Sequence, residues 1–388
     1  MNGPQRAEYR VIVIGAGIVG LFTAYHLARA GAGPILVVDR GFLSGGASGR
    51  NGGGVRQQWE TAATVRLARE SVQAYRQFGR EFGYNIWFRQ GGYLFLAESE
   101  PELERLRAVH RVVLAEGLPS RLLRPEEIPR YAPSLNLRSV RGGTFLDTDG
   151  TLYPFPAIWG VYEAVRRLGV EVSNFLEVSE VLREAGRVTG VATGRGLLRA
   201  PAVVNAGGGW SGEVAARAGL SVPNLATRHE ILATEPLKPF LDPMVIRLRD
   251  GLYFSQTMRG EVVGGLSVSH PSGTAPGMPS SARFLKSMAQ ALVDLVPTLG
   301  PLGVLRAWSG FYDDTPDGLP IIGEDPRLKG FFHANGFGGH GFMLAPASTR
   351  RVASAVLGEP VDLDPALFAP DRFLDPNRRS PHEALQPG

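Results

Sequence analysis

Near the start of the chain, continuous apolar runs alternate with a stretch that has helical spacing of its apolar residues. The apolar run Val11 to Ile14 enters a glycine-rich hexapeptide, a stretch with helical spacing follows to Ala30, and a second apolar run ends at Asp39. Short continuous apolar runs are typical of buried strands, and apolar residues three and four positions apart are typical of helices. The pattern therefore predicts a strand–helix–strand unit.

Two longer helices are predicted downstream from apolar residues at three- and four-residue spacings. The first follows a Gly/Ser/Asn-rich loop over 41–54, and the second should start near Pro101. Shorter helices are expected over 156–168, over 281–295 and up to Leu357. The apolar positions of the two long helices are Val65, Ala68, Val72, Tyr75 and Phe82, then Leu103, Leu106, Val109 and Val113.

Short strands return after residue 168. A hairpin is expected around Glu184 to Gly186, and the apolar run at 202–209 ends in three glycines, much as the first strand leads into glycines. This similarity predicts that the chain returns to the first sheet there. Residues 223–305 show alternating strands and one helix, which is typical of an α+β domain.

The glycine hexapeptide has the spacing of a dinucleotide-binding turn. Gly15-x-Gly17-x-x-Gly20 lies between a predicted strand and a predicted helix, the context that makes this pattern specific. The first glycine permits the tight turn, the second lets the backbone approach a pyrophosphate, and the third packs helix on strand. Ile18 and Val19 open the helix, whose free N–H groups attract phosphates, and Asp39 is placed to bind a ribose hydroxyl pair.

We therefore expect an α/β protein with two interleaved domains. A Rossmann-type domain is assembled from residues 1–85, 145–222 and 306–388. A substrate domain comprises residues 86–144 and 223–305. The length of 388 residues suffices for both.

The loop after the second strand favours a flavin over a nicotinamide cofactor. Its sequence, Gly45 to Gly54, is unusually rich in glycine. Backbone that passes close to a planar ring requires missing Cβ atoms. The expected cofactor contacts in this loop are Ala47, Ser48, Arg50, Asn51, Gly52 and Gly53.

The composition excludes several classes of function. Hydrophobic residues make up 44% of the chain and charged residues 20%, which is typical of a folded globular protein. Basic residues outnumber acidic ones by 41 to 37, but they are spread along the chain, so we expect no nucleic-acid partner. The absence of cysteine excludes disulfides, thiol catalysis and thiolate metal sites, and we expect no bound metal.

The N-terminal region resembles neither a signal peptide nor a membrane span. The segment before Val11 is short and polar, and the apolar stretch 11–28 is interrupted by Gly15, Gly17 and Gly20. We expect a cytoplasmic protein without a transmembrane segment. Peripheral attachment to a membrane is left open.

Several motifs in order along residues 10–375 resemble the D-amino-acid oxidase superfamily of FAD-dependent enzymes. They are GAGIVG with Asp39, SGRNGGGVRQQ, GGYLFL, VVNAGGGW, WSGFYDDTPDGLPIIG and GFGGHGFMLAPA. Within the superfamily the chain is most similar to sarcosine oxidase β chains and to β subunits of dye-linked L-proline dehydrogenases. The resemblance implies a glutathione-reductase-like FAD-binding domain, interleaved with an α+β substrate domain whose mixed, largely antiparallel sheet covers the flavin.

The resemblance also implies roles for single residues. Arg56 matches the arginine that holds the substrate carboxylate, for which a planar guanidinium is suited. Tyr253 and Tyr312 match tyrosines of the substrate cavity, and His340 matches a histidine beside the flavin. The further cofactor contacts that it implies are Arg40, Val178, Ala206, Gly207, Trp210, Gly310, Gly338, Gly339, Gly341 and Met343.

Structural alternatives stand beside these roles. Arg56 could be a surface arginine on the following helix, the two tyrosines could belong to the sheet core, and His340 could be satisfied by backbone groups. For His229 and His270, which follow or lie on predicted strands, we favour a structural role.

Three departures from similar enzymes bear on the cofactor. Monomeric sarcosine oxidases attach flavin to a cysteine, which this chain lacks, so FAD is expected to be noncovalent. Heterotetrameric sarcosine oxidases anchor a second flavin, FMN, on a β-chain histidine, whereas the stretch from Gly150 to Gly160 contains none. Any FMN at a subunit interface would therefore also be noncovalent. Met343 stands where sarcosine oxidases have a lysine, as it does in proline dehydrogenase β subunits.

The implied reaction is oxidation of the C–N bond of a small secondary-amine amino acid, proline or sarcosine. Hydride passes to flavin N5 and an imine results. The alternatives are a glycine or D-amino acid oxidase or dehydrogenase, an NAD-dependent dehydrogenase, and a non-catalytic subunit. We expect poor reaction with oxygen and electron transfer to a dye or to a partner subunit, docked near the 45–54 loop or the segment after Pro360. Hetero-oligomeric and homo-oligomeric assemblies are both left open.

Overall fold

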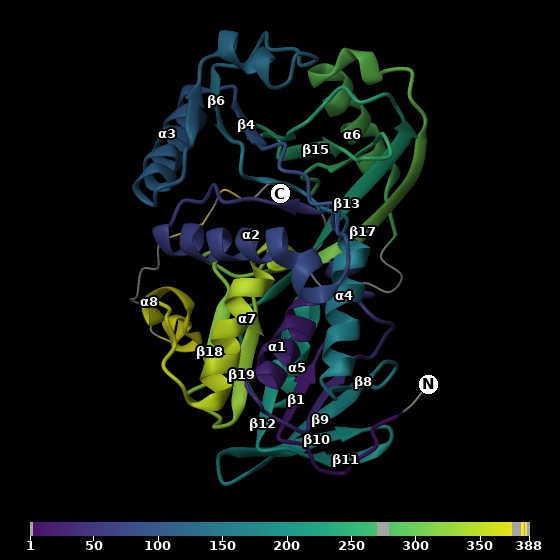
Figure 1. Ribbon diagram of the computed structural model, residues 1–388, viewed down its shortest axis with the longest axis vertical. Helices are drawn as coiled ribbons and strands as arrows, with labels where there is room; N and C mark the ends of the chain where they lie inside the picture. Colours follow the sequence, from purple (N-terminus) through teal and green to yellow (C-terminus); the bar gives the residue numbers. More distant parts are fainter. Residues whose placement is uncertain (1–2, 270–278, 375–381, 384, 386–388) are drawn as a thin grey trace.

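A six-stranded sheet forms the lower part of the molecule in the computed structural model, which describes residues 3–269, 279–374, 382–383 and 385 (Figure 1). Its strand order is β18-β19-β12-β1-β2-β8, and every pairing is parallel except that of β18 with β19. The strands are β1 (Val11–Ile14), β2 (Ile35–Val38), β8 (Glu171–Ser173), β12 (Ala202–Asn205), β18 (Ile321–Glu324) and β19 (Phe331–Asn335). The predicted return of the 202–209 run to the first sheet is confirmed, because β12 pairs directly with β1.

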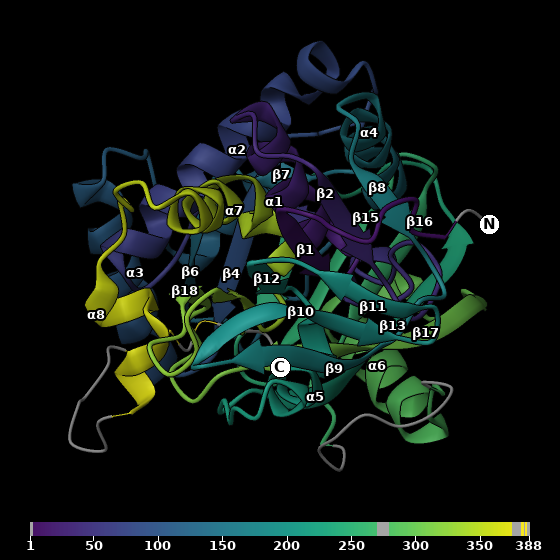
Figure 2. The same cartoon turned by 90° about the horizontal axis from the view of Figure 1, so that it is seen from below.

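The two faces of this sheet are covered differently. Val11 and Val13 pack with residues of α1 (Ile18–Arg29) and α7 (Gly341–Leu357), whereas Ile12 and Ile14 pack toward a separate three-stranded sheet. Successive side chains of a strand point to opposite faces, so a run of four buried apolar residues serves both. Figure 2 shows the helices on one side and the small sheet on the other. That sheet consists of β9 (Val178–Glu184), β10 (Arg187–Thr193) and β11 (Gly196–Arg199).

The predicted hairpin at 184–186 is confirmed at the turn between β9 and β10. Ala185 and Gly186 both have positive φ, at 47° and 75°. Two consecutive left-handed residues are typical of a tight hairpin turn.

An eight-stranded sheet forms the upper part of the molecule (Figure 1). Its order is β17-β13-β16-β15-β14-β4-β6-β5, and only β14 with β4 is parallel, so the expected mixed, largely antiparallel sheet is confirmed. The strands are β4 (Tyr93–Ala97), β5 (Arg121–Leu123), β6 (Gly142–Leu146), β13 (Leu225–Pro236), β14 (Met244–Arg247), β15 (Leu252–Gln256), β16 (Glu261–Gly265) and β17 (Val304–Asp314).

Two predicted boundaries differ from the strand pairing. The sequence grouped residues from 306 onward with the Rossmann-type segments, yet β17 pairs with β13 from Val304 to Asp314. Strand β6 likewise extends two residues beyond the boundary at 144. Local periodicity identifies a strand but not its partner, and the chain returns to the lower sheet only with β18. The division into two domains otherwise stays a prediction.

The predicted long helices are confirmed as α2 (Ala62–Phe82) and α3 (Glu100–Ala115). All nine predicted apolar positions are buried. The side chain of Ser99 accepts from the Glu102 N–H, and the Glu102 carboxylate accepts from the Ser99 N–H, so this capping box fixes the start of α3. Helix α2 lies across the molecule between the two large sheets (Figure 1).

The remaining elements are short or peripheral. They are α4 (Pro154–Arg167), α5 (Ser211–Arg217), α6 (Ala282–Leu295), α8 (Pro365–Phe368), β3 (Gly54–Val55), β7 (Gly150–Thr151) and the 3₁₀ turns η1 (Ala47–Gly49), η2 (Pro125–Arg130), η3 (Gly208–Trp210), η4 (Pro297–Leu299) and η5 (Pro370–Phe373). Within the described residues, every helix is too short or too polar to cross a bilayer.

Candidate active site

A cavity of about 730 Å³ extends from the carboxyl ends of β1, β2 and β12 to the inner face of the eight-stranded sheet. Cofactor and small-molecule sites usually have volumes of about 300–1,000 Å³ and lie at the carboxyl ends of parallel strands. The cavity is lined at one end by the glycine turn and at the other by Ile231, Met244 and Tyr253. One space therefore joins the predicted cofactor residues to the predicted substrate residues.

Gly15 and Gly20 are required by their surroundings, and Gly17 is closely packed. Gly15 has φ of +116°, and a Cβ there would lie 2.2 Å from the Ala206 carbonyl oxygen. A Cβ at Gly20 would lie 1.9 Å from the Gly15 carbonyl oxygen, and one at Gly17 would lie 3.1 Å from Ser48 Oγ. The turn between β1 and α1 thus holds its backbone against the cavity wall, as the spacing predicts.

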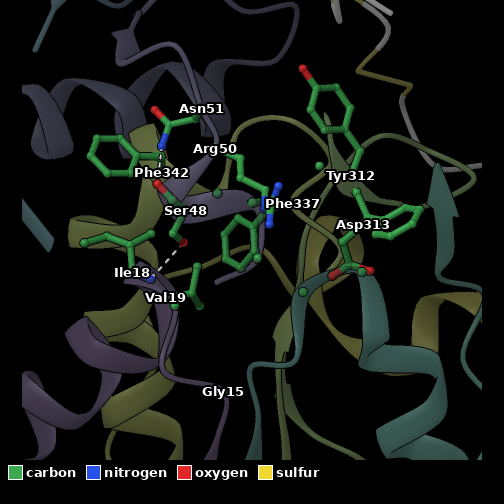
Figure 3. A pocket seen from close by; sticks show the side chains of 18 of the residues that line it. Gly15, Ile18, Val19, Ser48, Arg50, Asn51, Tyr312, Asp313, Phe337 and Phe342 are labelled. Carbon is green, nitrogen blue, oxygen red and sulfur yellow. Dashed lines mark hydrogen bonds between the residues drawn. The ribbon is translucent and has the colours of Figure 1, made fainter. Parts of the chain in front are cut away.

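The glycine loop is fastened to the start of α1. Ser48 Oγ accepts from the Ile18 N–H at 3.0 Å, and Asn51 Nδ2 donates to the Ser48 carbonyl at 2.5 Å (Figure 3). Arg50 donates to the carbonyl oxygens of Gly45 and Ser309 at 2.9 and 3.0 Å. These bonds hold the loop around the cavity. Within the loop the Arg50 N–H donates to the Ala47 carbonyl and forms the short turn η1, which the sequence did not predict.

Asp39 follows β2 and reaches back to the glycine turn. Its carboxylate oxygens accept from the N–H groups of Ala16 and Gly41, each at 2.8 Å. A carboxylate has about four acceptor sites, so the Asp39 carboxylate can accept further hydrogen bonds from a group bound in the cavity that Asp39 lines. This arrangement fits recognition of two ribose hydroxyls.

Nearly all the predicted site residues line this cavity; Gly20 and Gly53 do not. Gly20 faces β1, consistent with a packing role. Gly53 has φ of +76°, and its Cβ position would lie 2.0 Å from the Leu152 carbonyl oxygen, so it faces away toward β7. The loop reverses there to enter β3, so the cavity lining gives the predicted cofactor contact of Gly53 no support, and that contact stays a prediction.

Arg56 is buried, so its alternative as a surface arginine is wrong. Its side chain is 1% exposed and its guanidinium lies 3.8 Å from the centre of the Trp59 ring. It donates to the carbonyl oxygens of Gln58 at 2.7 Å and Leu385 at 2.5 Å, and Nη2 lies 3.2 Å from His340 Nε2. Burial lowers the pKa of Arg56, and the nearby Glu383 carboxylate opposes that shift.

His340 is held as a neutral ring. Since arginine can only donate, His340 Nε2 is the acceptor in its contact with Arg56. Burial, and then the charge of Arg56, hold the pKa of His340 well below its ordinary value. The ring also packs edge-on against Trp59, with centroids 4.6 Å apart.

The two predicted tyrosines meet at the far end of the cavity. Tyr253 on β15 and Tyr312 on β17 are hydrogen-bonded to each other, and burial raises the pKa of Tyr253 to about 12 and that of Tyr312 well above its ordinary range. The Tyr312 ring stacks on His229 at 3.7 Å, and a Cβ at Gly339 would lie 2.4 Å from that ring. Both hydroxyls therefore stay neutral, and His229 helps to fix the orientation of Tyr312.

Sequence reasoning missed Tyr93 and Asp149. Tyr93 on β4 lines the cavity, and a Cβ at Gly54 would lie 1.8 Å from its hydroxyl oxygen. Asp149 accepts from the Gln57 N–H at 2.7 Å and from the side chains of Gln57 and Gln58, each at 3.1 Å. The signal for Tyr93 was its place in the GGYLFL motif; for Asp149 the sequence carried no clear signal.

No group of three or more candidate metal ligands occurs among the residues that the structure describes. His229 contributes to the cavity wall. His270 lies outside the described residues.

The six-stranded sheet with its glycine turn, and the cavity covered by the eight-stranded sheet, define the class of protein as a dinucleotide-binding oxidoreductase. The sequence model described as FAD dependent oxidoreductase matches residues 10–355, so the chain belongs to this family, the D-amino-acid oxidase family of FAD-dependent oxidoreductases. The chain is 31% identical over 360 residues to the "Sarcosine oxidase subunit beta" of Rhodobacter capsulatus, covering 90% of this chain and 85% of that protein.

Solved structures agree with this assignment. The L-proline dehydrogenase of P. horikoshii superposes with a TM-score of 0.88 at 32% identity, covering 95% of this chain and 98% of that one. Glycine oxidase from Geobacillus kaustophilus superposes with a TM-score of 0.86 at 24% identity, covering 95% and 99%, and supports the fold alone.

The residues present fit FAD. A side chain at Gly15 would collide with the Ala206 backbone, one at Gly17 would crowd Ser48, and Asp39 is placed for a ribose. Cysteine is absent from the sequence, so a thioether link to the flavin is excluded.

Proposed function

We propose that this chain holds FAD noncovalently in the cavity and oxidises the C–N bond of a small amino acid bound at its tyrosine-lined end. The observation that carries the proposal is a single cavity that connects the glycine turn to Arg56, His340, Tyr253 and Tyr312. Gly15, Gly17 and Asp39 would hold the adenosine part. FAD bound there supplies the electron acceptor.

The chain's own groups bind and orient the substrate. Arg56 pairs with the substrate carboxylate in the proposed complex, because a buried guanidinium is a strong, directional partner for a carboxylate. His340 stays neutral beside it and accepts a hydrogen bond from Arg56. Tyr253, Tyr312 and Tyr93 keep their protons, so they contribute hydrogen bonds and exclude water without adding charge. Positioning and desolvation then supply most of the catalysis.

A secondary-amine amino acid is the favoured substrate. Two relatives with at least 30% identity carry the names sarcosine oxidase subunit beta and L-proline dehydrogenase. Sarcosine and proline share a carboxylate next to a secondary amine. The apolar wall formed by Ile231, Met244 and Ile246 is compatible with an N-methyl group or a ring.

The cations near the cavity favour a dehydrogenase over an oxidase. A preorganised positive charge would stabilise superoxide as oxygen is reduced. The three lysines of the sequence, Lys238, Lys286 and Lys329, are all exposed, and the low pKa of His340 keeps it uncharged. Arg50 and Arg56 are charged, but both direct donors at backbone carbonyls, which leaves fewer hydrogen bonds for a developing superoxide. Electrons would then pass to a partner subunit or a dye, and any FMN at such an interface would be held noncovalently.

The proposal is tested on the purified protein. Its absorption spectrum should be that of a flavin, and acid precipitation should release all the colour. A colourless protein that binds NAD would contradict the cofactor, and yellow left in the washed pellet would contradict noncovalent binding. Anaerobic mixing with proline, sarcosine, glycine and D-amino acids should bleach the flavin fastest with one of the first two. Reoxidation by a dye should then outpace reoxidation by air-saturated buffer.

A further inference from the structure

Two residues near the C-terminus lie beside Arg56, at one side of the cavity. We call Glu383 and Leu385 the C-terminal strap; each is 1% exposed. The Leu385 carbonyl oxygen accepts from Arg56 Nη2 at 2.5 Å. A segment more than 320 residues away in sequence thus occupies the guanidinium that is proposed to bind substrate.

The strap is fastened at the start of α2. The Glu383 carboxylate accepts from the N–H of Glu60 at 3.0 and 3.2 Å and from the N–H of Thr61 at 3.2 Å. The Leu385 N–H donates to Glu60 Oε2 at 3.1 Å, and the Glu383 N–H donates to the Asp317 carbonyl at 2.8 Å. A helix start favours a negative charge, so α2 reinforces this fastening.

The donors of Arg56 leave no free pair for a second acceptor. Nη1 donates to the Gln58 carbonyl, and the two hydrogens of Nη2 are directed at Leu385 and His340. A guanidinium holds a carboxylate through two parallel bonds, from Nη1 and Nη2 or from Nε and Nη2. Both pairs include Nη2. A carboxylate can therefore bind in this way only if Leu385 or His340 gives up its place.

Leu385 is the partner that can leave. The ring of His340 is packed against Trp59, and its backbone lies at the start of α7. The strap is held by a few hydrogen bonds to Glu60, Thr61 and Asp317. A charged carboxylate also makes shorter and stronger bonds to a guanidinium than a neutral carbonyl does.

We propose that the C-terminal strap is a specificity device: the Leu385 carbonyl occupies Arg56 until a ligand carboxylate displaces it. The inference rests on the proposed role of Arg56 in substrate binding. A ligand without a carboxylate cannot replace the Leu385 carbonyl as a hydrogen-bond acceptor for Arg56. The strap therefore stays in place, and Arg56 keeps its hydrogen bond to Leu385. A ligand that carries one releases the strap as it binds.

The test measures binding to the holoenzyme, without turnover. The probe is tetrahydrofuran-2-carboxylate, a ring acid with no oxidisable amine, and tetrahydrofurfuryl alcohol is its uncharged counterpart; calorimetry or the flavin spectrum reports the dissociation constant. Removal of residues 382–388 should tighten binding of the acid about tenfold, as expected when a competing hydrogen bond to a charged group is lost. Binding of the alcohol should not change. Unchanged or weaker binding of the acid would overturn the strap.

Two point variants guard against effects of truncation on folding. Glu383→Gln weakens the fastening and should tighten binding of the acid about threefold, since the loss of one charge–dipole contact is a smaller change. Glu359→Gln makes the same substitution at an exposed position at the end of α7 and should leave binding unchanged. Equal dissociation constants for the two variants would overturn the inference.

The unaltered holoenzyme gives an independent readout. Saturation with the acid should speed hydrogen exchange at the amides of Glu60 and Thr61, because Glu383 no longer protects them. Unchanged or slower exchange would overturn the strap. Arg56→Gln separates the two proposals: if the acid still binds this variant, the carboxylate role of Arg56 fails, whereas loss of binding without tightening on truncation rejects the strap alone.

Discussion

At the scale of the residue, Arg56 is a positive charge that the protein surrounds with acceptors instead of water. Two backbone carbonyls and a neutral histidine contact it, and the Glu383 carboxylate lies close enough to oppose the lowering of its pKa by burial. Removing a buried guanidinium leaves those acceptors unpaired, so the position is sensitive for structural as well as functional reasons.

We predict that Arg56→Gln lowers kcat/KM for the amino acid substrate about 10- to 150-fold, the equivalent of about 1.5–3 kcal/mol for a charged hydrogen bond. The loss should disappear with pyrrolidine, a cyclic amine without a carboxylate. Steady-state kinetics on both substrates provide the measurement. Equal losses on the two would show that Arg56 acts only through the fold.

Gly54 and Tyr93 make a second residue-scale test. A Cβ at Gly54 would lie 1.8 Å from the Tyr93 hydroxyl oxygen but 3.1 Å from the ring carbon that bears it. Gly54→Ala should therefore cost about 1–3 kcal/mol of unfolding free energy through overpacking. The double variant with Tyr93→Phe should regain much of that loss. Urea unfolding of the four proteins measures the coupling, and strictly additive effects would contradict the contact.

At the scale of the element, α1 can pack closely against the end of β1 because Gly20 has no side chain. A Cβ at Gly20 would lie 1.9 Å from the backbone oxygen of Gly15, which cannot rotate away. We predict that Gly20→Ala costs at least about 2 kcal/mol and weakens retention of FAD, because α1 must shift away from β1. Gly194→Ala, with no atom within 4 Å of its Cβ position, is the matched control and should stay within about 0.5 kcal/mol. Urea unfolding and flavin content after gel filtration measure both effects.

The sequence predicted those elements whose pattern is local. The buried positions of α3 are the four apolar residues that its spacing indicated, and the turn at Ala185 and Gly186 adopts the conformation expected of a tight hairpin. Strand β17 was recognised as part of a motif, but its pairing with β13 depends on residues about 80 positions away. Periodicity reports which face of an element is buried and not what buries it.

The same limit applies to the site. Glycine spacing was enough to predict the turn at Gly15, because the reason for each glycine lies within a few residues. The resemblance supplied Arg56 and His340, which lie 284 positions apart and are in contact. The contact of Arg56 with Leu385 had no counterpart in any local pattern, and neither did the acceptance of three hydrogen bonds by Asp149.

At the scale of the whole molecule, three buried carboxyl groups make stability depend on pH. Burial raises the pKa of Asp149, Asp313 and Glu383 to about 7 in each case. In an unfolded chain such groups titrate near pH 4. Between about pH 4 and 7 the folded protein binds more protons than the unfolded chain, so these groups lower the free energy of unfolding as pH rises.

We predict that Asp149→Asn is more stable relative to the parent protein at pH 8 than at pH 5. The comparison with the parent is needed because the lowered pKa values of half-buried His26 and buried His340 act in the opposite sense below about pH 6.5. Urea unfolding at both pH values gives the difference. Asp242→Asn, at a side chain that is 81% exposed, should show none. If the free energies of unfolding of parent and variant differ by the same amount at both pH values, the raised pKa of Asp149 is contradicted.

The interleaved strand order has a consequence for how the protein is made. Strand β1, near the start of the chain, is flanked by β2 and β12, and β12 in turn needs β19, which ends at Asn335. The wall of the cavity runs from Ile14 to Phe342 and Met343. A ribosome must therefore translate the chain at least as far as Met343 before a complete pocket can form. A shorter nascent chain has no finished place for the flavin, so loading of the cofactor has to wait until that residue has been added.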